Sequence, residues 1–455
     1  MKMFVCWSIL GAVMSIPSLA LPEVVETFIL PAEPISVHYI EQIMQIGPEG
    51  DVWLTIPMPQ RLMRISGDQI ECLFDSGIMT EWAPSLTFSP DGRLWIGFFE
   101  YTYSSDDGLH ASEVRIPPPH ADATSTFGAS GPPMIDADSR MYLLYNSTSF
   151  GKQSRSSVWE AWPRRDPARL FEAFTLDWPF LVYSGELWAD VSTYRGDPSQ
   201  LCEIDLDGGV VKAEYDLHYS FDAKGSEGLY WFAGWNGVYT FDRQDISQYC
   251  SSGDGVQFNW PMGLTADWTI WVAAFGEDWE PRGVVRIQGD ERRLFTTGDG
   301  LLTNSCWRPK IDYDGRVWLF NENDEGIIGL SRISDGGWPP MRLMLRQVKT
   351  EGTVAVEAQV INNGPVVGVD VYIAFEQDAQ LLYWPSWQPE PCPVQVNLRP
   401  GHNQTATIIS APRAHIPPGT YTFWGCMTGR NTQKLIGPLD RKFETLTIEV
   451  GDASE

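Results

Sequence analysis

Short runs of alternating apolar and polar residues, separated by turns rich in aspartate and glycine, follow one another along most of the chain. Residues 91–95 (Asp-Gly-Arg-Leu-Trp) and 314–318 (Asp-Gly-Arg-Val-Trp) are nearly the same motif. Five weaker copies bring the aromatic residues that end these motifs to seven: Trp53, Trp95, Tyr142, Trp188, Tyr230, Trp271 and Trp318. They are 42, 47, 46, 42, 41 and 47 residues apart. This period predicts seven four-stranded β-units.

Each repeat provides the strands of one unit. An apolar run before the turn predicts the first strand, and the aromatic anchor marks the second. A basic residue followed by an apolar one marks the third, at residues 64–65, 115–116, 169–170, 286–287 and 332–333, with altered copies at 203–204 and 240–241. Residues 69–74 are typical of the fourth. A solenoid is the alternative, but seven units without capping segments favour a closed ring. We expect the anchors to be buried between neighbouring sheets.

The last repeat lacks a convincing fourth strand. A spare strand-like run, Val24–Leu30, precedes the first repeat. We therefore predict that Val24–Leu30 completes the last sheet as its outer strand, which removes two open sheet edges and closes the ring.

The motif Asp-Gly-x-Leu/Val-Trp, followed by Gly-x-x-Arg-Ile, resembles the two-component-regulator propeller repeat. The resemblance covers roughly residues 22–336 and implies a ligand-sensing, periplasmic seven-bladed β-propeller. Propellers of the virginiamycin B lyase and gluconolactonase types carry similar second-strand signatures. Members of the sensor family precede a membrane span and a histidine kinase. This chain shows neither after its propeller, so we expect no transmembrane signalling by this chain alone.

Residues 341–450 differ from the repeats. Seven alternating segments predict strands at 342–346, 354–361, 369–375, 381–384, 394–398, 420–426 and 443–450. Such alternation with intervening turns predicts a β-sandwich. The segment is similar to the bacterial immunoglobulin-like domains that follow propellers in secreted proteins. The expected division is a signal peptide at 1–20, a propeller at 21–338 and an immunoglobulin-like sandwich at 339–455.

The first twenty residues begin with a basic residue, continue with a short apolar run and end with small residues at the expected cleavage site, Ser18–Ala20. This order is typical of a secretory signal peptide. A buried N-terminal strand is the alternative. No later segment holds eighteen consecutive apolar residues, so no membrane span is expected and the mature chain should be secreted or periplasmic. In an oxidising compartment Cys392 and Cys426, the two cysteines in the last third of the chain, are the best candidates for a disulfide. The pairing of Cys72, Cys202, Cys250 and Cys306 stays open.

Charge narrows the possible partners. The chain has 32 Lys and Arg against 59 Asp and Glu, a net charge of −27. That charge repels polyanions, which argues against nucleic acid as a partner. The pairs Asp136-Ala-Asp138 and Asp312-Tyr-Asp314 lack the spaced ligands and terminal glutamate of a calcium loop and predict turns instead. No nucleophile or zinc motif is present, so no cofactor is expected.

A second aromatic series precedes the anchors by 10 to 13 residues and is mostly followed by proline. We place it in the loops between the fourth strand of one unit and the first of the next, around the channel mouth. Its members are Trp82, Trp178, Tyr219, Trp260 and Trp307. These rings either fill gaps between units or form a surface that stacks on sugars and other flat apolar faces.

The distance from anchor to basic marker is greatest in the second and third repeats, which predicts long loops at 100–111 and 145–167. These segments contain the further candidate ligand-binding residues Tyr101, Tyr103, Trp159 and Trp162. A solvated loop without a binding role is the alternative.

The sequence therefore predicts an all-β protein that binds or scaffolds a carbohydrate or protein partner on the loop-rich face of the propeller. The alternative function is that of a metal-dependent lyase or lactone hydrolase acting at the channel mouth. The ligand, any catalytic activity and the oligomeric state stay open.

Overall fold

The computed structural model describes most of the chain after the first strand. The described residues are 24–30, 44–57, 60–75, 85–97, 102–105, 112–114, 126–129, 133–148, 155–162, 168–173, 175–183, 186–192, 200–215, 223–253, 255–324, 326–334, 337–350, 352–377 and 380–451. The predicted signal peptide lies outside them. The fold is all-β, with two short 3-10 helices in this part of the chain, η1 (Thr297–Asp299) and η2 (Arg413–His415). No helix among these residues is long and apolar enough to cross a membrane.

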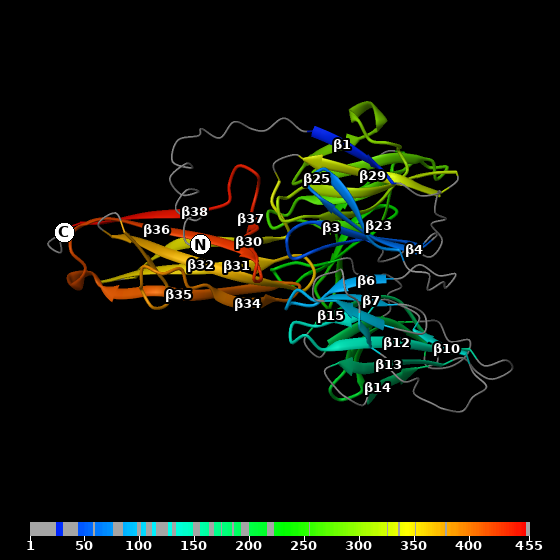
Figure 1. Ribbon diagram of the computed structural model, residues 1–455, viewed down its shortest axis with the longest axis horizontal. Helices are drawn as coiled ribbons and strands as arrows, with labels where there is room; N and C mark the ends of the chain where they lie inside the picture. Colours follow the sequence, from blue (N-terminus) through cyan, green and yellow to red (C-terminus); the bar gives the residue numbers. More distant parts are fainter. Residues whose placement is uncertain are drawn as a thin grey trace.

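The N-terminal part is β-propeller-like: its described residues form seven antiparallel sheets, which we number in chain order (Figure 1). Sheet 1 contains β2 (Met44–Ile46), β3 (Val52–Pro57), β4 (Gln60–Ser66) and β5 (Gln69–Asp75). Sheet 2 contains β6 (Ser85–Phe88), β7 (Leu94–Gly97), β8 (Thr102–Ser105) and β9 (Ser112–Val114). Sheet 3 contains β10 (Thr126–Ala129) and β11 (Met134–Ile135), which both pair with the second strand and together take the place of the first, followed by β12 (Met141–Thr148), β13 (Arg155–Trp162) and β14 (Ala168–Ala173).

The remaining four sheets repeat this order. Sheet 4 contains β15 (Thr175–Tyr183), β16 (Glu186–Ser192), β17 (Gln200–Asp205) and β18 (Val210–Tyr215). Sheet 5 contains β19 (Ala223–Lys224), β20 (Tyr230–Gly234), β21 (Gly237–Phe241) and β22 (Ile246–Ser251). Sheet 6 contains β23 (Gln257–Leu264), β24 (Ile270–Phe275), β25 (Pro281–Gln288) and β26 (Glu291–Phe295). Sheet 7 contains β27 (Cys306–Ile311), β28 (Val317–Asn323), β29 (Gly326–Ser334) and, at its edge, β1 (Val24–Ile29).

The N-terminal strand closes sheet 7 as predicted. β1 pairs antiparallel with β29 over its whole length, from Val24 opposite Ser334 to Ile29 opposite Gly329. Arg332 of β29 is only 5% exposed. It bonds Glu26 of β1 and, at 2.8 Å each, the Gly67 carbonyl and the Asp68 carboxylate of sheet 1. One side chain thus joins the first strand, the last sheet and the first sheet.

The anchors are buried, as predicted. Every one lies in the second strand of its sheet and is at most 6% exposed. In sheets 2, 3 and 7 the polar tip of the anchor bonds the first residue of the turn before it: the Trp95 and Trp318 indole nitrogens donate to Ser89 and Asp312 at 3.2 and 3.0 Å, and the Tyr142 hydroxyl donates to Asp136 at 2.9 Å. The aspartate pairs at 136–138 and 312–314 are therefore turns, as expected.

The turns between first and second strands share one five-residue form in sheets 1, 2, 3, 5, 6 and 7. The first residue donates its N–H to the carbonyl of the fifth, and the fourth donates to the carbonyl of the first. The fourth residue always has a positive φ, and it is Gly50, Gly92, Ser139, Gly228, Trp268 and Gly315 in turn. Glycine tolerates this left-handed conformation best, which explains the Asp-Gly motif. Ser139 and Trp268 adopt it without glycine.

Three expectations about the repeats were wrong. The segments 100–111 and 145–167 are not loops, because they contain the third strands β8 and β13. Arg169 lies in β14, the fourth strand of sheet 3, so the basic marker has moved to another strand in that copy. The Trp-Pro segments are not loops either. Trp178, Trp260 and Trp307 lie inside the first strands β15, β23 and β27, each at a register shift. Proline cannot donate to the ladder, so the strand bulges there and then continues.

The C-terminal part is a sandwich of two sheets that share one hydrophobic core. One sheet contains β30 (Met341–Thr350), β31 (Thr353–Asn362) and β35 (His402–Pro412). The other contains β32 (Val367–Gln377), β33 (Gln380–Tyr383), β34 (Val394–Leu398), β36 (Gly419–Gly429), β37 (Leu435–Ile436) and β38 (Glu444–Val450). The sequence did not predict β35, because most of its residues are exposed and the apolar alternation is weak.

The expected disulfide is absent. No disulfide joins Cys392 to Cys426 or links any other cysteines among the described residues. Cys426 alternates along β36 with the buried Gly425 and Met427, so it points away from the core, whereas Cys392 is exposed before β34. Being the last two cysteines in the sequence did not bring them together in space.

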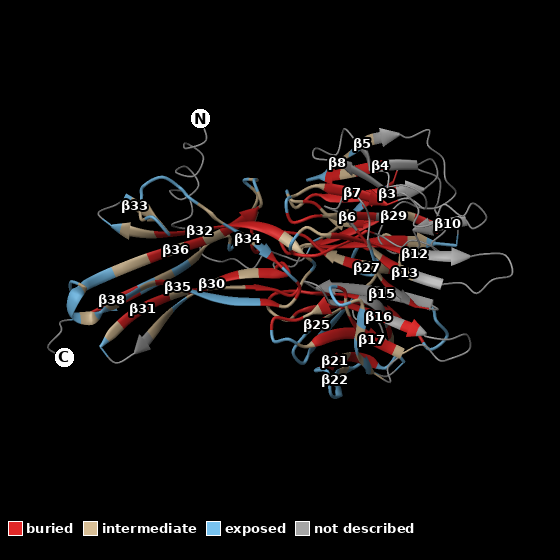
Figure 2. Cartoon of the chain, turned by 90° about the horizontal axis from the view of Figure 1, so that it is seen from below, coloured by how far each residue is buried: buried red, intermediate tan, exposed pale blue. Residues whose placement is uncertain are grey.

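The sandwich joins the propeller-like part at the turns between first and second strands (Figures 1 and 2). In all six five-residue turns the second residue contacts the sandwich or the segment leading into it. These residues are Pro48, Pro90, Ala137, Ser226, Ala266 and Tyr313. The backbone groups of these residues point out of their turns, so they are available to a partner surface.

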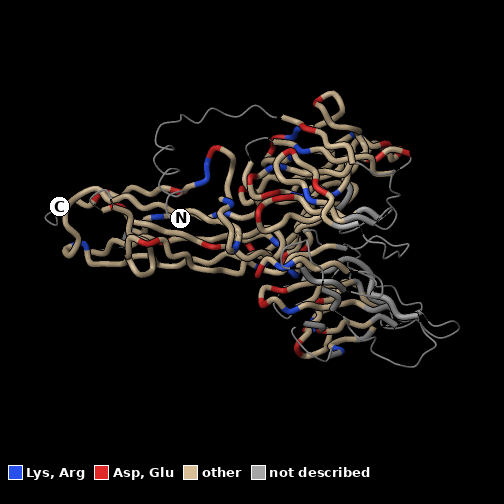
Figure 3. The backbone as a smooth tube through the Cα atoms, viewed as in Figure 1, with Lys and Arg blue, Asp and Glu red and all other residues tan. Residues whose placement is uncertain are grey.

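Buried polar contacts fix this junction. The Asn363 side chain, 1% exposed, accepts from the Ser226 N–H at 2.7 Å and donates to the Thr265 carbonyl at 2.8 Å. Asp314 accepts from Lys434 and Lys442 at 2.7 and 2.6 Å. Burial alone would raise the pKa of Asp314, but the two ammonium groups hold that pKa below its usual range. Figure 3 shows acidic and basic segments meeting at this junction.

We expect Arg332→Met to lower the free energy of unfolding by about 2–4 kcal/mol, because it removes charged hydrogen bonds and the cation–π contacts with Phe28 and Trp318. Urea denaturation measures this. The control is Arg346→Met, since among the described residues Arg346 pairs only with Glu357, at the surface, which is worth at most about 1 kcal/mol. Equal losses in both variants would show that Arg332 does not hold sheets 1 and 7 together.

We expect Gly368→Ala and Gly429→Ala to loosen the junction, because a Cβ at either position would overlap the carbonyl oxygen of Pro90 or Pro48. Small-angle scattering should show a larger radius of gyration, and proteolysis between the two parts should become faster. Gly419→Ala is the control, since its Cβ would lie 3.9 Å from Tyr421. Unchanged scattering in both junction variants would contradict this description of the contact.

Candidate functional site

The loops between second and third strands lie on the face opposite the sandwich. Successive strands are antiparallel, and the sandwich occupies the end where first and second strands are joined. The other end of each sheet is therefore the free face. The connections 235–236 of sheet 5 and 276–280 of sheet 6 lie on it, as does the start of β27 in sheet 7.

A cluster of four aromatic residues crosses sheets 5 to 7 at this face; we call Trp235, Phe275, Trp279 and Trp307 the tryptophan cluster. Trp235 and Trp279 meet edge to face, with ring centroids 5.1 Å apart and an interplanar angle of 88°. Phe275 lies 6.2 Å from Trp279 and 5.0 Å from Trp307. The rings thus form one continuous series from an exposed edge to the core.

The outer members of the cluster are solvent-exposed. Trp235 is 60% exposed and Trp279 is 48% exposed, whereas Phe275 is 3% exposed. Trp307 is half-buried, and its indole nitrogen donates to the Ser305 hydroxyl at 3.2 Å. Two large aromatic side chains exposed side by side are unusual on a protein surface and mark a contact site for another molecule.

Trp279 is held in an unfavourable backbone conformation. It occupies the fourth position of the turn Gly276–Glu280, where its φ is +63°. The Gly276 N–H donates to the Glu280 carbonyl at 2.8 Å, and the Trp279 N–H donates to the Gly276 carbonyl at 3.0 Å. A bulky residue in the left-handed region costs about 1–2 kcal/mol. Such strain is tolerated where it places a functional side chain.

Polar groups surround the exposed rings. Glu277, Asp278 and Glu280 are exposed in the same turn as Trp279. Arg282 lies 3.8 Å from Glu280, with both side chains largely exposed. The Asn236 carbonyl, next to Trp235, accepts from Ser252 and Gln248 at 2.8 and 3.0 Å and so fixes the loop of sheet 5. The site therefore combines apolar faces with many hydrogen-bond acceptors.

Of the two predicted site residues whose side chains the structure describes, Trp307 belongs to this cluster and Trp159 does not. Trp159 lies in β13, half-buried against a core that includes Trp95, so it is in a strand and not in a loop. The side chains of Trp178, Trp260, Tyr103 and Trp162, and the whole of Trp82, Tyr101 and Tyr219, lie outside the described residues.

Sequence reasoning missed Trp235 and Trp279. Both stand in short polar turns, Gly-Trp-Asn-Gly and Glu-Asp-Trp-Glu, between two strands. A tryptophan flanked by turn residues cannot lie in a strand core, and that pattern could have identified them.

In the part of the chain that the structure describes, no group of three or more His, Cys, Asp and Glu residues is arranged to hold a metal ion.

Comparison with known proteins gives weak similarities. No protein-family model and no curated protein matches the sequence. A streptogramin B lyase structure aligns at 15% identity over 69% of this chain and 97% of its own, with a TM-score of 0.45. An oligogalacturonate lyase from Vibrio parahaemolyticus aligns at 8% identity over 69% and 97%, also at 0.45. The extracellular domain of a putative hybrid two component system from B. thetaiotaomicron aligns at 11% identity over 90% and 72%, at 0.27. Similarities this low carry no argument about function.

We expect Trp279→Gly to leave the free energy of unfolding unchanged or to raise it by up to about 1 kcal/mol, because glycine relieves the strained φ. Trp271→Ala, at a buried anchor, should cost about 3–5 kcal/mol. Urea denaturation of both variants provides the comparison. A loss at residue 279 as large as that at residue 271 would make Trp279 a packing residue.

Proposed function

We propose that this is a secreted or periplasmic carbohydrate-binding protein whose recognition surface is the tryptophan cluster. In this proposal the seven sheets are the blades of one closed propeller, spanning residues 21–338. Residues 339–455 form an immunoglobulin-like domain that holds the propeller by its opposite face. Residues 1–20 direct export. Binding and presentation, rather than catalysis, are the activities proposed.

The observation that carries the proposal is the exposure of Trp235 and Trp279 at 60% and 48% in fixed turns. An indole presents a flat apolar face, and the C–H face of a sugar ring packs against it with loss of apolar area from water. Both turns are closed by backbone hydrogen bonds, so little side-chain and loop entropy is lost on binding.

The charge around the cluster also favours a neutral sugar. The acidic turn residues accept hydrogen bonds from hydroxyl groups, and a carbohydrate has many hydroxyls to donate. The same residues, in a chain of net charge −27, repel an acidic partner. A protein partner remains an outcome that the test distinguishes.

The test is a glycan array probed with the mature full-length protein, followed by titration of the best neutral glycan. We expect Trp235→Ala and Trp279→Ala each to weaken binding by about tenfold or more. The control is Tyr249→Ala, an aromatic residue 40% exposed on β22, outside the cluster. No bound glycan, or binding unaffected by either tryptophan variant, would overturn the proposal. In that case capture of a protein partner that depends on the same two residues would reassign the surface to protein binding.

A further inference from the structure

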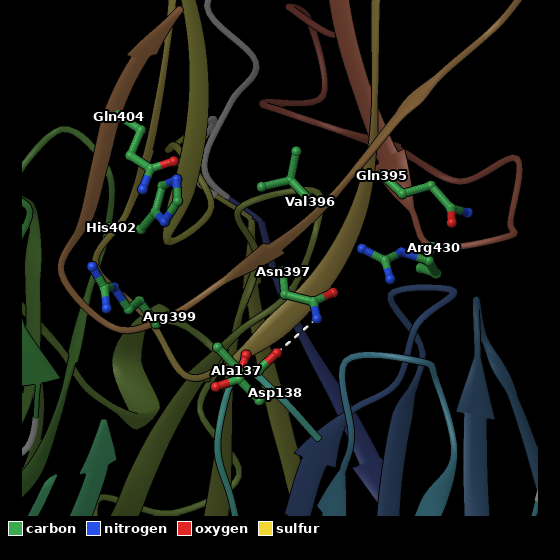
Figure 4. A pocket seen from close by; sticks show the side chains of 9 residues that line it. All are labelled: Ala137, Asp138, Gln395, Val396, Asn397, Arg399, His402, Gln404 and Arg430. Carbon is green, nitrogen blue, oxygen red and sulfur yellow. Dashed lines mark hydrogen bonds between the residues drawn. The ribbon is translucent and has the colours of Figure 1, made fainter. Parts of the chain in front are cut away.

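A pocket of about 430 Å³ lies at the junction between the propeller-like part and the sandwich (Figure 4). Its walls come from both parts. The turn of sheet 3 contributes Ala137 and Asp138, and the sandwich contributes the rest: Gln395, Val396, Asn397, Arg399, His402, Gln404 and Arg430. This volume lies within the range of small-molecule sites in proteins. The pocket is at the opposite end of the sheets from the tryptophan cluster.

The lining is strongly polar and contains two guanidinium groups. Figure 4 shows Arg399, His402 and Gln404 on one side of the pocket and Arg430 and Gln395 on the other. The Asn397 side chain lies between them and donates to the Ala137 carbonyl at 2.6 Å. Its oxygen remains available as an acceptor. Groups of this kind surround a ligand with both donors and acceptors.

The positive charge in the pocket is only partly compensated. Arg430 lies 3.8 Å from Asp370, and its buried Nε has no hydrogen-bond partner among the described residues. Arg399 is exposed and makes no ion pair with any described residue. Asp138 is the one acidic residue in the lining. Acidic residues far outnumber basic ones in this chain of net charge −27. An arginine that lacks an acidic partner is therefore not expected in a pocket from the amino-acid composition alone.

A second, independent observation is the state of His402. It is 5% exposed, yet its ring forms no hydrogen bond with any described residue. Burial, with a further contribution from the charge of Arg399, lowers the pKa of His402 below its usual value. This favours the neutral ring, which offers one donor and one acceptor. The ring nitrogens are not among the fully buried atoms that lack a partner, so they are open to water or to a ligand in the pocket.

We propose that this junction pocket binds a small hydroxylated carboxylate, that is, a sugar acid. Arg399, with Arg430 opposite, provides charge-assisted hydrogen bonds to the carboxylate. His402 and the amides of Gln395, Asn397 and Gln404 bond the hydroxyls, and Asp138 accepts from a hydroxyl at the propeller side. This site is independent of the proposed function, because it shares no residue with the tryptophan cluster.

The pocket lies where a bound ligand can strengthen the contact between the propeller-like part and the sandwich. Its walls belong to both parts of the chain, so a ligand that contacts both stabilises their junction. Binding to the folded, joined state raises the melting temperature in proportion to the logarithm of ligand concentration above Kd. A ligand held by the sandwich alone leaves the junction unchanged.

The test is calorimetric titration of the mature full-length protein with D-glucuronate at low ionic strength, with D-glucose and acetate as controls. We expect glucuronate to bind, and glucose and acetate to bind at least about tenfold more weakly. Arg399→Gln should weaken glucuronate binding by about ten- to hundredfold. Because Arg399 is exposed, this variant should fold normally, which the melting temperature without ligand verifies.

The matched control is Arg346→Gln, which removes another exposed arginine of the sandwich outside the pocket. It should bind glucuronate like the wild type, and both proteins should melt at a higher temperature with glucuronate present. Three results would each overturn the proposal: no binding of glucuronate at millimolar concentration, acetate binding as tight as glucuronate, or equal binding by wild type and Arg399→Gln. Trp279→Ala should leave glucuronate binding intact, which separates this site from the carbohydrate surface.

Discussion

The organisation of this protein depends on the five-residue turn between the first and second strands. In sheets 2, 3 and 7 its first residue accepts a hydrogen bond from the polar tip of the buried anchor, as Asp312 does from Trp318. Its fourth residue takes a left-handed conformation, which closes the turn tightly. Its second residue is thereby pushed outward, where its backbone groups meet the sandwich. This backbone geometry, repeated from sheet to sheet, forms the surface against which the sandwich packs.

The contact with the sandwich decides which surfaces remain available for binding. Because the sandwich occupies one end of the sheets, ligands reach the propeller-like part from the opposite, loop-bearing end. There the same type of turn, at Gly276–Glu280, holds Trp279 instead of glycine at the strained position and exposes its ring. At the junction itself the two surfaces leave a polar pocket beside the turn of sheet 3. The protein thus has two separate candidate binding surfaces: the exposed aromatic rings of the tryptophan cluster and the polar, arginine-containing pocket at the junction.

The main errors of sequence interpretation have one physical cause: a short motif does not show with which strand, and at which residues, its segment pairs in a sheet. Arg169 matched the third-strand marker but lies in the fourth strand, because strand order depends on pairing with distant residues. The Trp-Pro segments carried the composition of loops, yet cross-strand hydrogen bonds on both sides of the bulge keep them within strands. Cys392 and Cys426 are successive cysteines in the sequence, but the pairing of strands in the sandwich decides how far apart they lie in space.

The sequence by itself determined the all-β class, the number of repeats, the burial of the anchors and the use of Val24–Leu30 to complete the last sheet. These follow from local patterns: alternation, Asp-Gly turns and the missing strand of one repeat. Only the tertiary structure decided that Trp235, Phe275, Trp279 and Trp307 form one cluster, and that Arg399 and Arg430 face a common pocket. Both sites bring together residues from different sheets. Their distances are set by how whole sheets pack, and no periodicity along the chain encodes that packing directly.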